Sequence, residues 1–136
     1  MISKVFIDTG AWIALAATLD PFHERARRQW EQLFSTGARL FTSVPVVLET
    51  FTFLDRKGSR PLAIRWKDSL ATVRRLKIFD CTGKELDQAW SWIDRPGLHR
   101  LSLVDATSFA LMTNAKIKTA FAFDTHFAAA GFRLVP

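Results

Sequence analysis

The segment Lys4-Val5-Phe6-Ile7-Asp8 decides the expected fold, because a short apolar run ends there in a carboxylate. Its length and apolar composition are typical of a buried β-strand. Further along the chain, apolar runs alternate with patterns of helical spacing, which is the signature of an α/β domain with a mainly parallel sheet. The sequence therefore predicts an α/β fold whose first strand runs from Lys4 to Asp8.

Turn residues and helix caps divide the rest of the chain into short elements. Further strands are expected at residues 39–42, 77–80, 119–123 and 132–135. Helices are expected at residues 11–17, 21–34, 43–58, 62–76, 84–93 and 102–115. Asp20, followed by Pro21, is expected to cap one helix, and Ser43 is expected to cap the next. These elements are expected to form a single domain that spans residues 1–136.

The composition is that of a globular protein with a packed core. Hydrophobic residues make up 49% of the chain, with twelve Phe and five Trp, which excludes an intrinsically disordered protein. No apolar stretch approaches the length of a membrane span, and the start of the chain lacks the apolar core of a signal peptide. Because Cys81 is the only cysteine, an intramolecular disulfide is excluded and the expected location is the cytoplasm.

Positive charge is concentrated in the middle of the chain. Residues 55–77 contain eight Lys or Arg residues against two Asp, which equals the whole net charge of +6. Such a segment favours an anionic partner, nucleic acid first, although a solvated helix face that only aids solubility explains the charge equally well.

Four carboxylates lie beside or within apolar runs, where an ionised group is costly to bury. They are Asp8, Glu49, Asp105 and Asp124. Asp8 and Asp124 follow expected strands, at the sheet edge where parallel sheets bind ligands. Glu49 and Asp105 are expected on the inward faces of their helices, and no Lys or Arg lies within three residues of either. A cluster of four acids needs either a shared cation or a protonated member.

Oxygen ligands alone predict a hard cation, Mg²⁺ or Mn²⁺. Zinc is disfavoured, because Cys81 and the three His residues show no ligand spacing. Taken singly, Asp8, Asp105 and Asp124 each have a structural explanation, as a turn residue, a helix N-terminal residue and a helix cap. Glu49 is the hardest to explain in this way. Asp80 also ends an apolar run, but its basic neighbours assign it a peripheral role.

Each of the four acids lies in a short motif, and the motifs follow one another along nearly the whole chain. They read Val5-Phe6-Ile7-Asp8-Thr9-Gly10-Ala11-Trp12, Pro45-Val46-Val47-Leu48-Glu49-Thr50, Leu101-Ser102-Leu103-Val104-Asp105-Ala106-Thr107-Ser108-Phe109 and Ala122-Phe123-Asp124-Thr125-His126-Phe127. In this order and spacing, the chain resembles the PIN-domain ribonucleases, in particular the small VapC-type toxins of bacterial toxin–antitoxin pairs.

The resemblance implies a three-layer α/β/α sandwich with a mainly parallel central sheet, and an acidic pocket that binds Mg²⁺ or Mn²⁺. It implies RNA endonuclease activity, with Asp8, Glu49, Asp105 and Asp124 as the catalytic and metal-site residues. It also implies a homodimer and a small antitoxin partner that blocks the site. One departure concerns His126, which stands where many relatives carry a further Asp. His126 is expected to position the turn, with a phosphate contact or proton transfer as the alternatives.

The expected chemistry is metal-assisted hydrolysis of an RNA phosphodiester. Candidate phosphate contacts are the basic residues of 56–77 together with Arg25, Arg27 and Arg28. Trp12 and Trp66 are candidates for stacking on RNA bases. Thr9 and Ser102 are either hydrogen-bond donors to the site or turn and cap residues. The helix face with Phe51, Phe53 and Leu54 is either a dimer surface or part of the core.

Three other functions remain open from the sequence. One is a PIN-like RNA-processing nuclease that has no antitoxin. Another is a catalytically inactive module that binds RNA or a partner protein. The third is a phosphotransferase with Asp8 as nucleophile, as in haloacid-dehalogenase-like enzymes, but those carry Asp-x-Asp at the first strand, and residue 10 here is Gly10.

Overall fold

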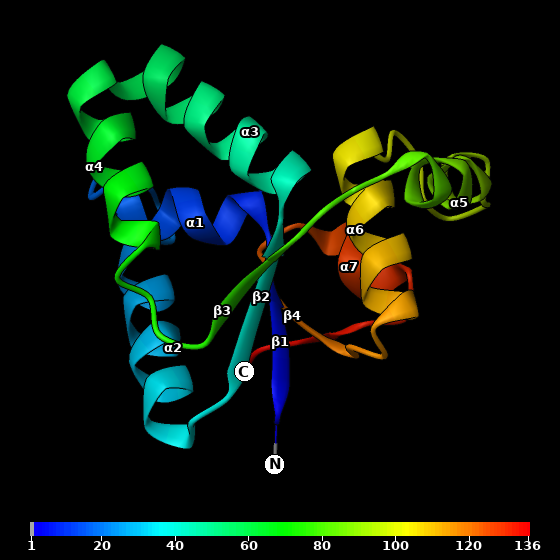
Figure 1. The fold of residues 1–136 in the computed structure, drawn as a ribbon, viewed down its shortest axis with the longest axis horizontal. Helices are drawn as coiled ribbons and strands as arrows, with labels where there is room; N and C mark the ends of the chain where they lie inside the picture. The colour runs from blue at the N-terminus through cyan, green and yellow to red at the C-terminus, as the bar shows by residue number, and fades with distance from the viewer. Residues whose placement is uncertain (1) are drawn as a thin grey trace.

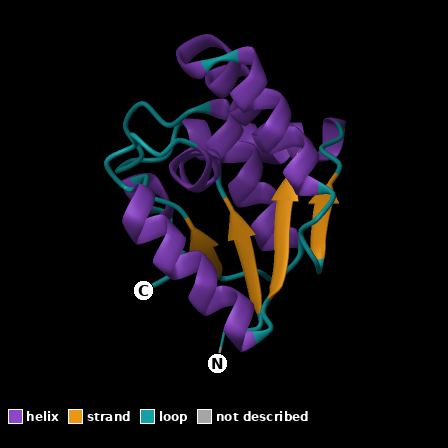
Figure 2. Cartoon of the chain, turned by 90° about the vertical axis from the view of Figure 1, so that its left-hand side faces the viewer, coloured by secondary structure: helices purple, strands orange, loops and turns teal. Residues whose placement is uncertain are grey.

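A computed structural model describes residues 2–136 and shows a central sheet with helices on both faces (Figure 1). The strands are β1 (Lys4–Ile7), β2 (Arg39–Ser43), β3 (Leu76–Phe79), β4 (Thr119–Phe121) and β5 (Arg133–Leu134). Their order in the sheet is β3-β2-β1-β4-β5, and every neighbouring pair is parallel. Figure 2 shows the strands pointing in one direction. The predicted α/β/α sandwich is confirmed.

The helices form the two outer layers. They are α1 (Thr9–Ala16), α2 (His23–Thr36), α3 (Val44–Phe53), α4 (Arg60–Leu70), α5 (Gly83–Ile93), α6 (Leu103–Asn114) and α7 (Thr125–Ala129), with a π-helical turn at Leu54–Gly58 between α3 and α4. Helices α1, α2 and α4 lie on one side of the sheet, and α5, α6 and α7 lie on the other (Figure 1). No helix within residues 2–136 combines the length and the apolar character that crossing a membrane requires.

The central strand β1 explains why the chain begins with a continuous apolar run. Its residues Val5, Phe6 and Ile7 have no exposed surface, because helices cover both faces of the sheet. On one face, Trp12 packs against Trp66 with ring centroids 5.9 Å apart. On the other face, α6 packs an aromatic ring against α7. The core therefore extends through both helical layers from β1.

Several helix starts are determined by local capping. The Ser43 hydroxyl accepts a hydrogen bond from the Val46 N–H, as predicted, and Thr82 and Glu85 form a reciprocal capping box at α5. The prediction for Asp20 was wrong in detail. Its carboxylate accepts the Phe22 N–H at 2.8 Å within a turn that precedes α2, so the helix begins at His23. Helix α1 likewise begins at Thr9, two residues earlier than expected.

The largest boundary error concerns α4, which was expected at residues 62–76. The helix ends at Leu70, and the chain then turns into β3 through Arg75, whose φ is 63°. The Arg75 carbonyl accepts a hydrogen bond from the Leu40 N–H, which brings the chain into register with β2. Val73 and Leu76 continue the helical spacing of apolar residues, but they pack against the core from the turn and the strand instead.

Candidate metal centre

Asp8 and Asp124 reach the same edge of the sheet because β1 and β4 are parallel neighbours. Asp8 directly follows β1, and its backbone N–H donates to the carbonyl of Phe121 at the end of β4, at 3.0 Å. Asp124 precedes α7, and its carboxylate accepts the backbone N–H of His126 at 2.8 Å. Both carboxylates therefore stand at the carboxyl ends of strands, as predicted from the sequence.

Helices α3 and α6 bring the other two acids to this edge. Helix α3 starts directly after β2, so its side chains lie over the carboxyl end of the sheet. Glu49 on this helix is half-buried, which is less than the sequence predicted. The hydroxyl of Ser102 accepts the backbone N–H of Asp105 at 3.0 Å, which anchors the first turn of α6. Asp105 is buried there, with 6% of its surface exposed.

All four predicted acids line one pocket of about 230 Å³. The structure thus brings together side chains that lie up to 116 positions apart in the sequence, counted from Asp8 to Asp124. Arg100 and His126 line the same pocket. Asp80 does not contribute to it and is exposed beyond β3, which agrees with the peripheral role expected for it.

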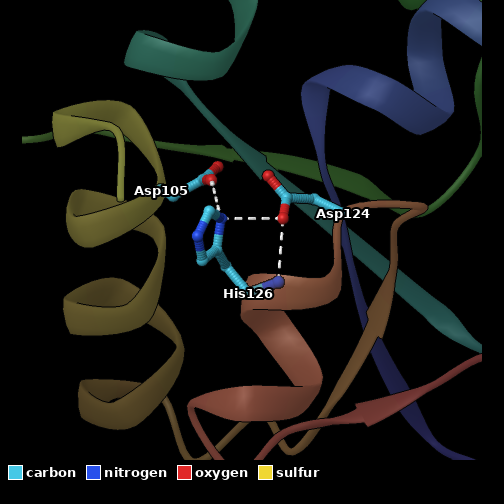
Figure 3. A group of neighbouring side chains, drawn as sticks. All are labelled: Asp105, Asp124 and His126. Atoms are coloured by element: carbon cyan, nitrogen blue, oxygen red, sulfur yellow. Dashed lines mark hydrogen bonds and ion pairs between the residues drawn. The ribbon is translucent and has the colours of Figure 1, made fainter. Parts of the chain in front are cut away.

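Asp105, Asp124 and His126 form the tightest group in the pocket (Figure 3). One potential ligand atom from each lies within 4.8 Å of those of the other two. Nδ1 of His126 is 2.8 Å from Oδ1 of Asp124 and 3.9 Å from Oδ2 of Asp105. This group is a candidate metal site within the residues that the structure describes.

Two of the carboxyl groups hold their protons at unusually high pH. Burial raises the pKa of Asp8 to about 7, against the backbone N–H of Thr9 and together with the charge of Glu49. Burial also raises the pKa of Asp105 to about 9, with further contributions from Asp8 and Asp124. The cluster therefore retains protons at neutral pH unless a cation compensates its negative charge.

At Asp124 and His126, by contrast, the pKa shifts favour the charged form of each side chain. Partial burial would raise the pKa of Asp124, but the backbone N–H of His126 and the side chains of Asp105 and His126 lower it. The carbonyl of His99 raises the pKa of His126, against partial burial and with the help of Asp124. Asp124 is thus the acid that the pocket itself keeps charged.

The donor set fits a hard divalent cation. Oδ1 of Asp8 is buried and has no hydrogen-bond partner among residues 2–136, which is costly unless a cation or water satisfies it. Carboxylate oxygens are the ligands that Mg²⁺ and Mn²⁺ prefer. Of the two hydroxyl groups considered from the sequence, Ser102 caps α6, whereas Oγ1 of Thr9 is buried beside the pocket without a partner in the described chain.

Only some of the residues that the sequence predicted to contact RNA lie near this pocket. Arg56 and Lys57 line a second hollow that also includes Glu49. Arg60 instead pairs with Asp55, and none of the basic residues predicted to contact phosphate lines the pocket of the four acids. Trp12 and Trp66 are buried, so the prediction that they stack on RNA bases was wrong. Both face the core because α1 and α4 pack together with α2.

Sequence reasoning missed Arg100, the basic residue that lines the acidic pocket itself. It lies outside the basic segment, and its φ of 58° places it in a tight turn before α6. The signal available in the sequence was its position, two residues before the Ser102 cap of the helix that carries Asp105.

Comparison with known proteins identifies the family. The PIN domain model matches residues 5–133. The chain is 40% identical over 129 residues to the 23S rRNA-specific endonuclease VapC20 of Mycobacterium tuberculosis (strain CDC 1551 / Oshkosh), covering 94% of this chain and 95% of that protein.

Two solved structures resemble the fold of this chain. The crystal structure of Mycobacterium tuberculosis VapC20, described as a sarcin-ricin loop cleaving toxin, has a TM-score of 0.82 at 34% identity, with 94% and 95% of the two chains covered. VapBC2 from Rickettsia felis, bound to a DNA fragment from its promoter, has a TM-score of 0.67 at 12% identity over 96% of each chain, a likeness of fold. The chain therefore belongs to the PIN-domain family, in its VapC-type branch.

Proposed function

We propose that this chain is a metal-dependent endoribonuclease, the toxin of a toxin–antitoxin pair, with 23S ribosomal RNA as its substrate. The observation that carries the proposal is the meeting of Asp8, Glu49, Asp105 and Asp124 in one pocket. The 40% identity to an endonuclease specific for 23S rRNA supports the substrate class.

In the proposed mechanism, Asp8, Asp105 and Asp124 would hold Mg²⁺ or Mn²⁺. When bound, the ion would supply a water of lowered pKa and would neutralise charge that develops on the phosphate. Of the two site acids that lie on helices, Glu49 is less buried than Asp105, so its carboxyl group can orient the attacking water. Burial of Asp8 and Asp105 keeps these two side chains in fixed positions, which places the reacting groups without a further entropy cost.

Basic residues near the acids would position the RNA backbone. Arg100 lines the acidic pocket, and Arg56 with Lys57 lies on the other hollow that includes Glu49. Cationic side chains next to a carboxylate cluster allow a phosphate to approach groups that would otherwise repel it. We therefore propose Arg100, together with Arg56 and Lys57 from the set predicted from the sequence, as the phosphate contacts nearest the acids.

Cleavage of 23S rRNA in ribosomes tests the proposal. The purified chain is expected to cut this RNA at a defined site when Mg²⁺ or Mn²⁺ is present, and a chelator is expected to abolish the cut. The ends are mapped by primer extension. Cleavage that persists at the same site and rate without divalent ions would contradict the metal-dependent mechanism.

We propose a small antitoxin as the protein partner. A groove of about 540 Å³ between α1, α2 and α4 supports this proposal. It is lined by aromatic and aliphatic side chains, Trp30, Phe34 and Leu62 among them, with Arg27 and Arg65 also present. Such a groove fits an amphipathic helix that carries acidic residues.

We also propose a cytoplasmic location, because ribosomal RNA is the proposed substrate. We propose that residues 1–136 form a single domain.

We propose that the chain forms a homodimer through the exposed apolar residues of α3, α5 and α6. These residues are Val44, Leu48, Phe53, Leu86 and Leu103. Adjoining hollows are lined by members of this set, so the residues form a connected apolar surface. Of the dimer residues suggested by the sequence, Phe53 belongs to this surface, whereas Leu54 is fully buried in the core.

Replacing Leu48 with Glu is expected to convert the dimer to a monomer. Leu48 is 64% exposed at the middle of this surface, so the substitution leaves the core intact but buries a charge in the dimer. A loss of about 2–3 kcal/mol corresponds to roughly 10²-fold weaker association. Sedimentation at graded concentration measures it. Leu19→Glu is the control, because Leu19 is 96% exposed on another part of the chain; a Leu48→Glu variant that remains dimeric contradicts the assignment.

A further inference from the structure

We propose that His126 is a nitrogen ligand of the divalent ion, through Nδ1, and that this chain therefore has a mixed oxygen and nitrogen metal site. The inference rests on the proposed function, since it concerns the same ion. It goes beyond the four carboxylates, and it assigns a chemical role to a residue that the sequence predicted to position the turn.

The hydrogen bond on the far side of the ring determines which nitrogen is available. Nε2 of His126 lies 2.9 Å from the backbone carbonyl oxygen of His99. A carbonyl oxygen only accepts, so Nε2 must carry the proton. In the neutral ring, Nδ1 then has a free lone pair, and a backbone carbonyl of this kind commonly orients a metal-binding imidazole.

The free nitrogen is directed into the acidic pocket. Figure 3 shows the ring of His126 with Nδ1 facing the carboxylates of Asp105 and Asp124. The Nδ1 atom is buried and has no partner in hydrogen-bond geometry among residues 2–136, although a protonated Nδ1 would form an ion pair with Asp124 at 2.8 Å. Its surroundings are therefore two carboxylates and no donor, an arrangement that a cation would complete.

The spacing of the three atoms suits a shared cation. Nδ1 is 2.8 Å from Oδ1 of Asp124 and 3.9 Å from Oδ2 of Asp105. One ligand atom from each of the three residues lies within 4.8 Å of the others, so all three could contact the same small divalent ion.

Two hydrogen bonds of His126, one from its backbone and one from its ring, hold the imidazole in this position. The backbone N–H of His126 donates to Asp124, so the turn that presents Asp124 also places the imidazole. The His99 carbonyl belongs to the turn before α6, the helix that carries Asp105. A neutral imidazole adds a nitrogen ligand to the pocket without adding negative charge, which favours Mn²⁺ over Mg²⁺.

Electron spin echo spectroscopy of Mn²⁺ bound to the full chain tests the assignment. Wild-type protein is expected to show modulation from a directly coordinated ¹⁴N nucleus. The modulation is expected to change to the ¹⁵N pattern when the histidines are ¹⁵N-labelled, a comparison that requires no substitution. His126→Asp is expected to bind Mn²⁺ without nitrogen modulation and with a smaller preference for Mn²⁺ over Mg²⁺.

His99→Asn is the matched control, because it removes a nearby imidazole but keeps the backbone carbonyl that orients His126. It is expected to retain the nitrogen modulation. Mn²⁺ bound by the wild type without nitrogen modulation would overturn the inference and leave the proposed nuclease standing, with Nδ1 of His126 protonated and paired with Asp124. Failure of the wild type to bind Mn²⁺ or Mg²⁺ at all would overturn both.

Discussion

Replacing Asp8 with Asn is expected to reduce RNA cleavage by about 10²–10⁴-fold, because a buried charge interaction worth roughly 3–5 kcal/mol is lost from the metal centre. Asp8 is 3% exposed at the end of the central strand, and its Oδ1 has no partner among residues 2–136. Asn has nearly the same shape, so the backbone at the end of β1 is retained. The loss would therefore report on the negative charge of this one carboxylate. Initial rates of 23S rRNA cleavage at saturating Mn²⁺ measure the effect.

Asp80→Asn is the matched control for Asp8→Asn. Asp80 also follows a strand of the same sheet, but it is exposed and does not line the acidic pocket. The Asp80→Asn variant is expected to cut RNA at the wild-type rate. If Asp8→Asn and wild-type protein cleave equally, the reaction takes place at another site or belongs to a contaminant.

Asp105→Asn is expected to stabilise the metal-free protein at alkaline pH. The pKa of Asp105 is raised from 3.8 to about 9 in the folded state, chiefly by burial. A raised folded-state pKa means that the folded protein binds a proton which the unfolded chain releases, so stability is lost as pH rises from about 4 to about 9. Asn cannot ionise and removes this loss. At pH 8.5, a gain of at least ~1 kcal/mol would raise Tm by about 3–5 °C.

Thermal unfolding with and without Mn²⁺ checks this prediction. Asp124→Asn is the control of opposite sign, because the pKa of Asp124 is lowered in the folded state and its charged form adds stability above about pH 4. Saturating Mn²⁺ is expected to raise the Tm of the wild type above that of Asp105→Asn, which reverses their order in the metal-free state. An ion at 100 times its Kd stabilises the folded protein by about 2.7 kcal/mol. Equal slopes of Tm against pH for the two metal-free proteins would contradict the raised pKa.

Much of the site was accessible from the sequence because each acid has apolar neighbours. Asp8 follows a run that is completely buried in β1, and Asp105 follows the Ser102 cap of a largely buried helix. Parallel strands place their carboxyl ends at one edge, so the meeting of these acids follows from strand order and local pattern together. The four motifs also carried the resemblance to the PIN-domain family, which the comparisons confirm.

Other features were outside the reach of local pattern. Trp66 lies in a basic segment, but α4 turns it into the core against Trp12, a contact between residues far apart in the chain. Arg100 enters the acidic pocket through a left-handed turn that no spacing rule indicates. The end of α4 at Leu70 depends on the pairing of β3 with β2, which overrides the helical spacing of Val73.

The sequence by itself determined the α/β class, most strand positions, the Ser43 and Ser102 caps and which four acids meet in one pocket, because these depend on residues that are neighbours in the chain. Only the tertiary structure decided how strongly each acid is buried, and hence that Asp105 holds a proton where Asp124 does not. It also decided that the His99 carbonyl directs His126 toward those acids. Burial and hydrogen bonding across distant segments arise only when the layers pack, so local sequence cannot contain them.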